Sequence, residues 1–180
     1  MEGLPLLGLA VVAVGVLGRE LGPTGPRTGR GPSYAPTVRR PGKYFSWAEL
    51  TRTRAGTPNT PDPEQAKNLI YLAGTLDAIR EYVRRPMRVH SAFRSAATNA
   101  AVGGAPGSKH LDGSAADVSV IGLSAEDLAV EAVASGAPFD KLIWYPTTGH
   151  LHIQTDPARA RRRTLIATSG GYVERQPVAV

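Results

Sequence analysis

The sequence predicts an α+β domain in which helices pack on an antiparallel sheet, and three observations favour this fold class. Helix signals dominate the first half of the chain and strand signals the second half, an order typical of α+β proteins. The chain has 180 residues, of which 42% are hydrophobic, enough for one globular domain plus shorter segments. The last strand signals are joined by a tight-turn sequence, which indicates a hairpin. We expect the domain at residues 44–158.

The domain is expected to begin at YFSWAEL, where aromatic residues first gather, and a long helix follows in PDPEQAKNLIYLAGTLDAIREYV. Asp62 suits the N-cap position, Pro63 the first helical position and Gln65 the reciprocal position of a capping box. Apolar residues then recur at steps of three and four, which gives the helix one apolar face. These residues are Leu69, Leu72, Leu76, Ile79 and Val83. Pro86 ends the helix.

Shorter elements alternate in the rest of the domain. MRVHSAF has the alternation of a strand, and residues 95–102 suit a short helix with Ser95 as its N-cap. AADVSV is a second strand, and residues 125–135 suit a helix between Ser124 and Gly136. DKLIWY and HLHIQ are predicted to form two further strands, joined by PTTG.

The segments that flank the domain differ from it in composition. Residues 1–18 contain the apolar run LPLLGLAVVAVGVL, which is shorter than the roughly 20 residues of an upright membrane helix and is interpreted as a membrane anchor or signal-anchor. Residues 19–43 are rich in Gly, Pro and Arg and predict a linker. Residues 159–180 are interpreted as a basic C-terminal tail. We expect a membrane-anchored domain that faces the cell envelope, periplasmic or extracellular, or one associated with a virion. The positive charges that follow the apolar run favour the cytoplasmic side instead, and the sequence leaves both topologies open.

Charge and cysteine content limit the partners and the metal chemistry. The net charge of +6 favours an acidic partner, but many of the arginines lie in the flanking segments, so nucleic acid is not the expected partner. The chain has no cysteine, so any metal site must use histidine and carboxylate ligands.

Three of the four histidines lie in two short segments, SKHLDGSAADVSV and GHLHIQ. Alternation in the second segment places His150, His152 and Gln154 on one face of a strand. In the first segment Asp117 lies on a polar strand face, so His152 and Asp117 converge if the strands are neighbours. The turn before Asp117 can return His110 to the same place. Two histidines, a carboxylate and water form the pattern of a catalytic zinc site. The alternative is that each histidine has an ordinary structural role.

Four segments together resemble a known family: FSWAELTRT, NTPDPEQ, RVHSAFRSAATNAAVGGAPGSKHLDGSAADVS and FDKLIWYPTTGHLHIQ. The chain resembles the zinc D-Ala-D-Ala carboxypeptidases, cell-wall metallopeptidases that share a fold with the hedgehog signalling domain. The resemblance covers about residues 44–155. Its most specific motif is S-x-H-x-x-G-x-A-x-D at residues 108–117, followed by H-x-H at residues 150–152.

The resemblance implies three ligands for one zinc ion: His110, Asp117 and His152. It also implies that His150 stabilises the oxyanion of the tetrahedral intermediate and that Arg94 binds the carboxylate of the substrate. Ser108 either bonds to the substrate or a ligand, or caps its turn. His90 is interpreted as structural.

The sequence departs from the resemblance at one position. Many members of that family carry an acidic residue shortly before the last zinc-binding histidine, as the general base. Here residues 144–149 read WYPTTG and contain no carboxylate, and Asp140 is interpreted as structural. His150 acting as base, or Tyr145 polarising the carbonyl, are the alternatives. Because a general base contributes about 10²–10⁴-fold to a rate, reduced activity is expected.

Three functions follow from these patterns. The first is a zinc metallopeptidase that hydrolyses peptide bonds of peptidoglycan stem peptides, as a D-Ala-D-Ala carboxypeptidase or an endopeptidase, in an envelope-associated or phage lytic enzyme. The second is a non-catalytic zinc-containing module that binds the cell wall. The third is a structural protein of a virion or envelope. The expected partners are peptidoglycan peptides and, through residues 1–18, a membrane.

Overall fold

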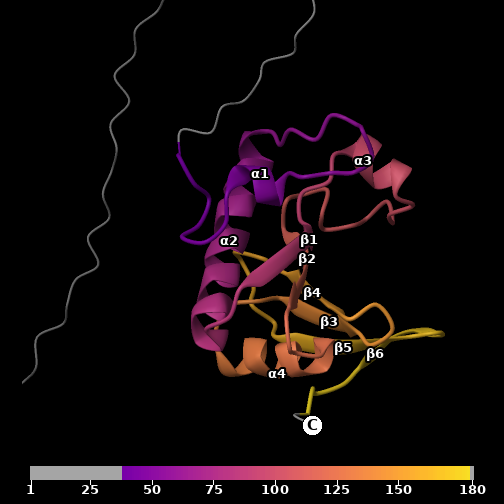
Figure 1. The fold of residues 1–180 in the computed structure, drawn as a ribbon. Coiled ribbons are helices and arrows are strands. Elements are labelled where there is room, and N and C mark those ends of the chain that lie inside the picture. The colour runs from indigo at the N-terminus through magenta and orange to yellow at the C-terminus, as the bar shows by residue number, and fades with distance from the viewer. Residues whose placement is uncertain (1–37, 179–180) are drawn as a thin grey trace, which may run out of the picture. The chain divides into compact units, whose positions relative to one another are not determined.

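The computed structural model describes residues 38–178 and contains four helices and six strands in this part of the chain (Figure 1). In chain order the elements are α1 (Trp47–Leu50), α2 (Pro63–Val83), β1 (Met87–Ser91), α3 (Ala96–Ala101), β2 (Ala115–Val120), α4 (Ala125–Ala134), β3 (Lys141–Tyr145), β4 (His150–Gln154), β5 (Arg163–Thr168) and β6 (Gly171–Glu174). The apolar run expected to be an anchor lies outside the described residues. Within residues 38–178, no helix has both the length and the hydropathy needed to cross a membrane.

The six strands form one sheet in the order β1-β2-β4-β3-β5-β6. All neighbouring strands are antiparallel except β3 and β5, which are parallel. The predicted α+β fold is therefore confirmed, while the sheet is mixed rather than antiparallel throughout. The parallel pair arises because the chain returns from the end of β4 to the start of β3 before it enters β5.

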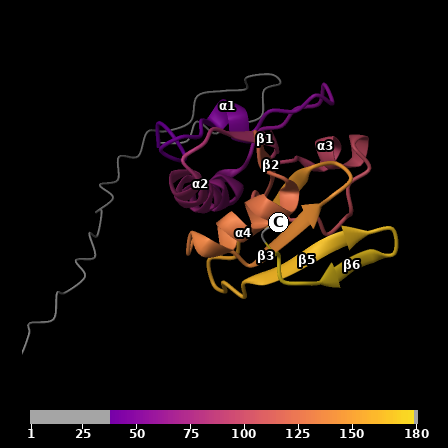
Figure 2. The same ribbon diagram turned by 60° about the horizontal axis from the view of Figure 1, so that its bottom comes forward.

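Helix α2 forms as its sequence predicts. The Asp62 side chain accepts a hydrogen bond from the Gln65 amide, and the Gln65 side chain accepts one from the Asp62 amide, which completes the capping box. The helix ends at Arg84, which has a left-handed conformation, two residues before Pro86. Its apolar face is buried in the core. Figures 1 and 2 show α2 and α4 on the same side of the sheet.

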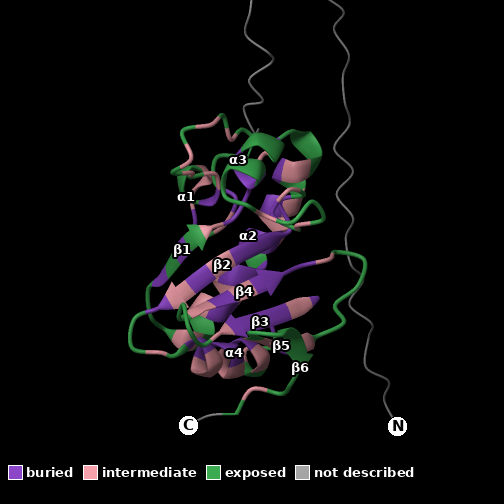
Figure 3. Cartoon of the chain, turned by 90° about the vertical axis from the view of Figure 1, so that its right-hand side faces the viewer, coloured by how far each residue is buried: buried purple, intermediate pink, exposed green. Residues whose placement is uncertain are grey.

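Alternation in the central strands separates a core face from an open face. Leu151 and Ile153 of β4 are fully buried in the core, whereas His150 and His152 lie on the other face. Strand β2 does the same, with Val118 directed to the core. Figure 3 shows the buried and half-buried residues along β2, β4 and β3, and the exposed residues of β1.

The structure corrects the predicted basic tail at residues 159–180. Residues 163–174 form β5 and β6, and β5 pairs with β3 inside the sheet. Thr164 and Leu165 are buried, so this segment belongs to the folded domain, which extends beyond the predicted boundary at residue 158. The cluster of arginines concealed a strand with three consecutive apolar residues, Leu165, Ile166 and Ala167, and a hairpin turn at Ser169 and Gly170.

Candidate metal centre

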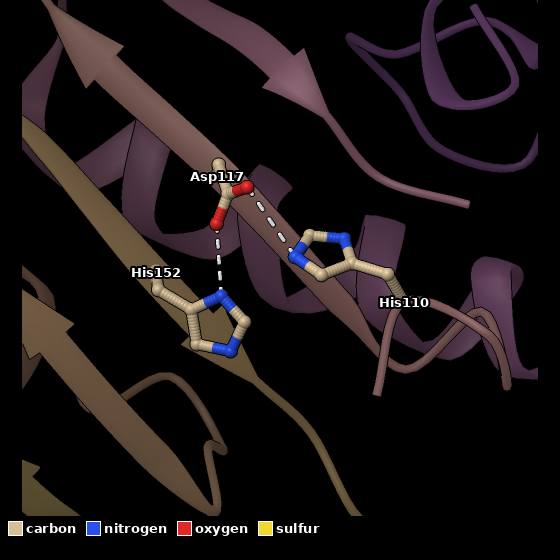
Figure 4. Close-up of side chains that lie close together, drawn as sticks. All are labelled: His110, Asp117 and His152. Atoms are coloured by element: carbon tan, nitrogen blue, oxygen red, sulfur yellow. Dashed lines mark hydrogen bonds and ion pairs between the residues drawn. The ribbon is translucent and has the colours of Figure 1, made fainter. Parts of the chain in front are cut away.

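Three side chains meet on the open face of the sheet: His110, Asp117 and His152 (Figure 4). Asp117 and His152 are directly paired across β2 and β4, and His110 comes from the loop before β2. His152 Nδ1 lies 2.8 Å from Asp117 Oδ1, and His110 Nε2 lies 3.3 Å from Asp117 Oδ2. One donor atom from each residue lies within 4.8 Å of the other two. The predicted convergence is therefore present.

The loop that carries His110 is held against helix α2. The Gln65 side chain donates to the Leu111 carbonyl oxygen, and Gly113 has a φ of +73° in the turn after His110. A Cβ atom at Gly113 would lie 2.6 Å from the Gln65 carbonyl oxygen, so both the conformation and the close approach require glycine. This explains the glycine of the S-x-H-x-x-G motif: it lets the loop pack closely enough on α2 to direct His110 at Asp117.

A backbone carbonyl sets the orientation of the His110 ring. His110 Nδ1 lies 2.6 Å from the Ala92 carbonyl oxygen, which can only accept, so Nδ1 carries the hydrogen. In the neutral form of the ring, Nε2 then presents a lone pair to Asp117 Oδ2, another acceptor. Two such acceptors repel unless a cation lies between them, and a carbonyl partner on the far nitrogen is the usual support of a metal-binding histidine. Two imidazoles and a carboxylate fit zinc.

The electrostatics keep the two strand residues in forms that bind a metal. Burial raises the pKa of the Asp117 carboxyl, but its interactions with His110 and His152 outweigh burial and hold the pKa well below the usual range. Burial lowers the pKa of His152, and Asp117 offsets only part of this effect. A carboxylate and a neutral imidazole are the required ligand forms.

Arg94 lies beside Asp117 and contacts it directly. Its Nη2 donates to Asp117 Oδ2 at 2.7 Å, and its Nε donates to Ser91 Oγ at 2.7 Å. The resemblance implied that Arg94 binds the substrate. The structure adds a contact that the sequence did not predict, because part of the guanidinium holds the carboxylate of Asp117.

A cleft of about 360 Å³ brings the six predicted site residues together. They are Arg94, Ser108, His110, Asp117, His150 and His152. Among the described residues that line this cleft, Asp117 is the only carboxylate. Within the described residues, this lining therefore offers no carboxylate in place of the one that is absent before His152.

His150 is held at the edge of the cleft by two neighbours. Its Nδ1 lies 2.7 Å from Thr148 Oγ1, and its ring stacks on Tyr145 with centroids 4.4 Å apart. Burial lowers the pKa of His150 below its ordinary value. These contacts fix the ring in place. Within residues 38–178, Nε2 of His150 has no hydrogen-bond partner.

Tyr172 of β6 is a cleft residue that sequence reasoning missed. Its hydroxyl lies 3.0 Å from the Tyr145 hydroxyl. Burial, followed by this hydrogen bond, raises the pKa of Tyr145, so Tyr145 stays a neutral phenol. The two glycines of SGGYVE, which indicate a hairpin turn just before Tyr172, are the signal that could have found it.

Two residues interpreted as structural have contacts that agree with this role. The buried carboxylate of Asp140 accepts hydrogen bonds from Arg161 at 2.5 and 2.7 Å and from the Gln154 side chain at 2.9 Å. His90 Nε2 lies 2.8 Å from Ser119 Oγ. The His90 ring lies 6.5 Å from that of His150, on the open face but outside the lining of the cleft.

An α+β sheet that presents two imidazoles and a carboxylate in an open cleft is typical of metal-dependent hydrolases. The family model for peptidase M15 matches residues 43–154, more than half of the chain, and the chain belongs to this peptidase family. The match confirms the resemblance to the zinc D-Ala-D-Ala carboxypeptidases and assigns the chain to the hydrolases. No curated protein matches the chain. Strands β5 and β6, with Tyr172, lie outside the matched residues.

Proposed function

We propose that the protein is a zinc-dependent peptidase that hydrolyses peptide bonds of peptidoglycan stem peptides, as a carboxypeptidase or an endopeptidase. The observation that carries this proposal is the geometry around Asp117. His110 Nε2 and His152 Nδ1 both face its carboxylate, and the Ala92 carbonyl oxygen turns the unprotonated nitrogen of His110 inward.

His110, Asp117 and His152 would hold one zinc ion. When bound, zinc polarises the scissile carbonyl and lowers the pKa of water towards neutrality. The protein's own residues bind and orient the peptide around that centre. We assign the oxyanion of the reaction to His150, because Thr148 and Tyr145 fix its ring at the edge of the cleft while Nε2 remains available to the substrate.

Arg94 and Ser108 are the proposed substrate-binding residues. Arg94 Nη2 is bonded to Asp117, whereas Nη1 has no hydrogen-bond partner in the described part of the chain and can donate to a substrate carboxylate. Ser108 lines the cleft, and only its backbone takes part in the bonds of its turn. Its hydroxyl is therefore free to contact the peptide.

The lining of the cleft also favours a second candidate function, a non-catalytic zinc-containing module that binds the cell wall. With His150 engaged as the oxyanion donor, the described residues supply no further carboxylate to accept a proton from water. Loss of a general base typically costs about 10²–10⁴-fold in rate. We therefore expect slow hydrolysis if the protein is an enzyme, and none if it is a binding module.

Hydrolysis and metal content of the same sample separate the two functions. The full chain is incubated with the peptide acetyl-Lys(acetyl)-D-Ala-D-Ala and with purified peptidoglycan, before and after removal of metal and again after zinc is restored. Cleavage that disappears with the metal and returns with zinc is the expected result. Bound zinc with no cleavage of either substrate contradicts the peptidase and favours the binding module.

We also propose that the domain acts while tethered, on the envelope side of a membrane or in a virion as part of a phage lytic enzyme. The apolar run of residues 4–17 and the Gly/Pro-rich residues 19–43 support this location. Fractionation compares the full chain with a chain that lacks residues 1–18. Membrane association that requires residues 1–18 is expected, and equal solubility of both chains contradicts the tether.

A further inference from the structure

A second pocket, of about 320 Å³, adjoins the cleft on the β1 side. We call it the arginine pocket, and we define it by Arg52, Arg54, Arg88, His90 and Arg94. Arg94 lines both the arginine pocket and the cleft. Arg94 is therefore the residue that the cleft and the arginine pocket have in common.

Apart from Arg94, which pairs with Asp117, the arginines of this pocket lack the acidic partners that other arginines of the protein have. The side chains of Arg54 and Arg88 form no ion pair or hydrogen bond with another described residue, and the Arg52 side chain donates only to the Val89 carbonyl oxygen. By contrast, Arg161 pairs with Asp140, and Arg163 pairs with Glu174, elsewhere in the same domain. No carboxylate lines the arginine pocket within residues 38–178.

The electrostatic effect of this charge is visible on His90. Burial is the main cause that lowers the pKa of His90, and Arg88 is the next; Asp117 opposes them, and Arg52 and Arg54 add smaller lowering effects. A concave pocket lined by one sign of charge concentrates ions of the other sign. Guanidinium groups bind carboxylates through paired hydrogen bonds, so the pocket has the chemistry of an anion site.

We propose that the arginine pocket binds a second carboxylate of the substrate, on the segment that leaves after cleavage. This inference rests on the proposed function, in which Arg94 binds the carboxylate next to the cleaved bond. The preferred leaving segment then carries at least two carboxylates, one for Arg94 and one for Arg54 and Arg88. Cleavage of a single terminal D-alanine leaves the arginine pocket unused, so the pocket favours a larger, more anionic leaving segment.

A binding experiment tests the pocket without any need for turnover. The zinc-loaded full chain is titrated calorimetrically with glutarate, which has two carboxylates, with acetate, which has one, and with inorganic phosphate. The variant Arg54→Gln/Arg88→Gln removes two charges from the pocket. The control variant Arg84→Gln/Arg85→Gln removes two charges at the end of α2, outside both pockets.

We expect glutarate to bind the wild type and the control about tenfold more tightly than acetate, and we expect this preference to disappear in Arg54→Gln/Arg88→Gln. Equal affinity for glutarate and acetate in the wild type overturns the proposal, as does a preference that survives in the pocket variant. Binding of phosphate, but not glutarate, that depends on Arg54 and Arg88 also overturns it, in favour of a site for phosphate groups.

A kinetic comparison separates failure of this inference from failure of the proposed function. Two peptides, acetyl-Lys(acetyl)-D-Ala-D-Ala and acetyl-Lys(acetyl)-D-Ala-D-Glu, differ by one carboxylate on the leaving residue. We expect kcat/KM to be about tenfold higher for the second peptide in the wild type, and equal for both in the pocket variant. If both peptides are cleaved equally by the wild type, the peptidase stands and the pocket assignment fails. If neither is cleaved but the glutarate preference behaves as expected, the peptidase fails and the anion site stands.

Discussion

The two faces of the sheet are formed by the same strands, but they differ in burial and in the kinds of side chain they carry. On the face that packs against α2 and α4, Leu151 and Ile153 are fully buried among apolar residues. On the open face, His150 and His152 alternate with them and line the cleft. A shift of one residue in register would exchange the two sets. The apolar neighbours of each site residue in β4 thus hold it in position. We therefore expect the core face to determine the stability of the fold and the open face to determine catalytic activity.

The substitution that should reduce hydrolysis most is on the open face of the sheet. His152→Ala removes a proposed zinc ligand and leaves the core unchanged, so hydrolysis should fall by about 10³-fold or more, because a bound metal contributes several kcal/mol to the reaction. Cleavage of a stem peptide measures it, with unfolding in urea as the check on stability. The control Arg84→Gln/Arg85→Gln, at residues that line neither the cleft nor the arginine pocket, should keep its activity. Loss of activity in both variants would contradict the assignment of the cleft.

The corresponding substitution on the core face is at Leu151, the residue next to His152, and it should reduce stability rather than activity. Leu151→Ala should lower the free energy of unfolding by about 2–5 kcal/mol, because Leu151 is fully buried and a cavity replaces its side chain. The folded fraction should still bind zinc with the same stoichiometry. Urea unfolding and metal analysis of the same preparation provide both quantities. A folded Leu151→Ala protein without zinc would show that the two faces are not separable.

A third prediction concerns Asp140, which lies just before β3 and has no assigned catalytic role. Asp140→Asn should destabilise the protein by about 1–2 kcal/mol at neutral pH, less than for a fully buried pair because the Arg161 side chain is 43% exposed. The hydrogen bonds from Arg161 lower the pKa of Asp140 below its ordinary value of 3.8. A lowered pKa stabilises the fold above the unfolded-state pKa and loses this effect as the pH falls.

The difference in stability between wild type and Asp140→Asn should therefore be full at pH 7 and should shrink progressively below about pH 4. Urea unfolding across this range measures it. A difference that stays constant down to pH 2 would mean that the ion pair is not its source.

The smallest effect is expected at the wall that β6 adds to the cleft. Tyr172→Phe removes the hydroxyl 3.0 Å from the Tyr145 hydroxyl, a hydrogen bond worth about 0.5–1.5 kcal/mol. The rate of hydrolysis should change by less than about tenfold, and the free energy of unfolding by about 1 kcal/mol or less. Steady-state kinetics measure the first quantity. A rate loss of about 100-fold or more would give Tyr172 a direct part in the reaction.

Sequence reasoning succeeded where local chemistry determines structure. Asp62 and Gln65 form the predicted capping box because both partners lie within one turn of helix. The alternation of HLHIQ assigns His152 to a polar face without knowledge of its neighbours. The predicted meeting of His152 with Asp117 also came from alternation, given that β2 and β4 are adjacent, and the structure pairs these residues directly.

It failed where contacts join distant segments. Strand β5 is parallel to β3, and nothing within the arginine-rich segment 159–163 shows that β3 offers it a free edge. The bond from Arg94 to Asp117 joins the loop after β1 to strand β2, two segments that no local pattern connects. The arginine pocket combines Arg52 and Arg54, from the loop after α1, with Arg88 of β1, which no spacing in the sequence connects.

The measurement that tests the central claim most directly is the zinc content of the full chain beside that of His152→Ala and Leu151→Ala. We expect about one zinc ion per chain in the wild type and in folded Leu151→Ala, and a loss of zinc in His152→Ala while its fold is retained. Zinc that remains bound in His152→Ala, or a wild type that binds none when zinc is supplied, would contradict the assignment of His110, Asp117 and His152 as a metal centre.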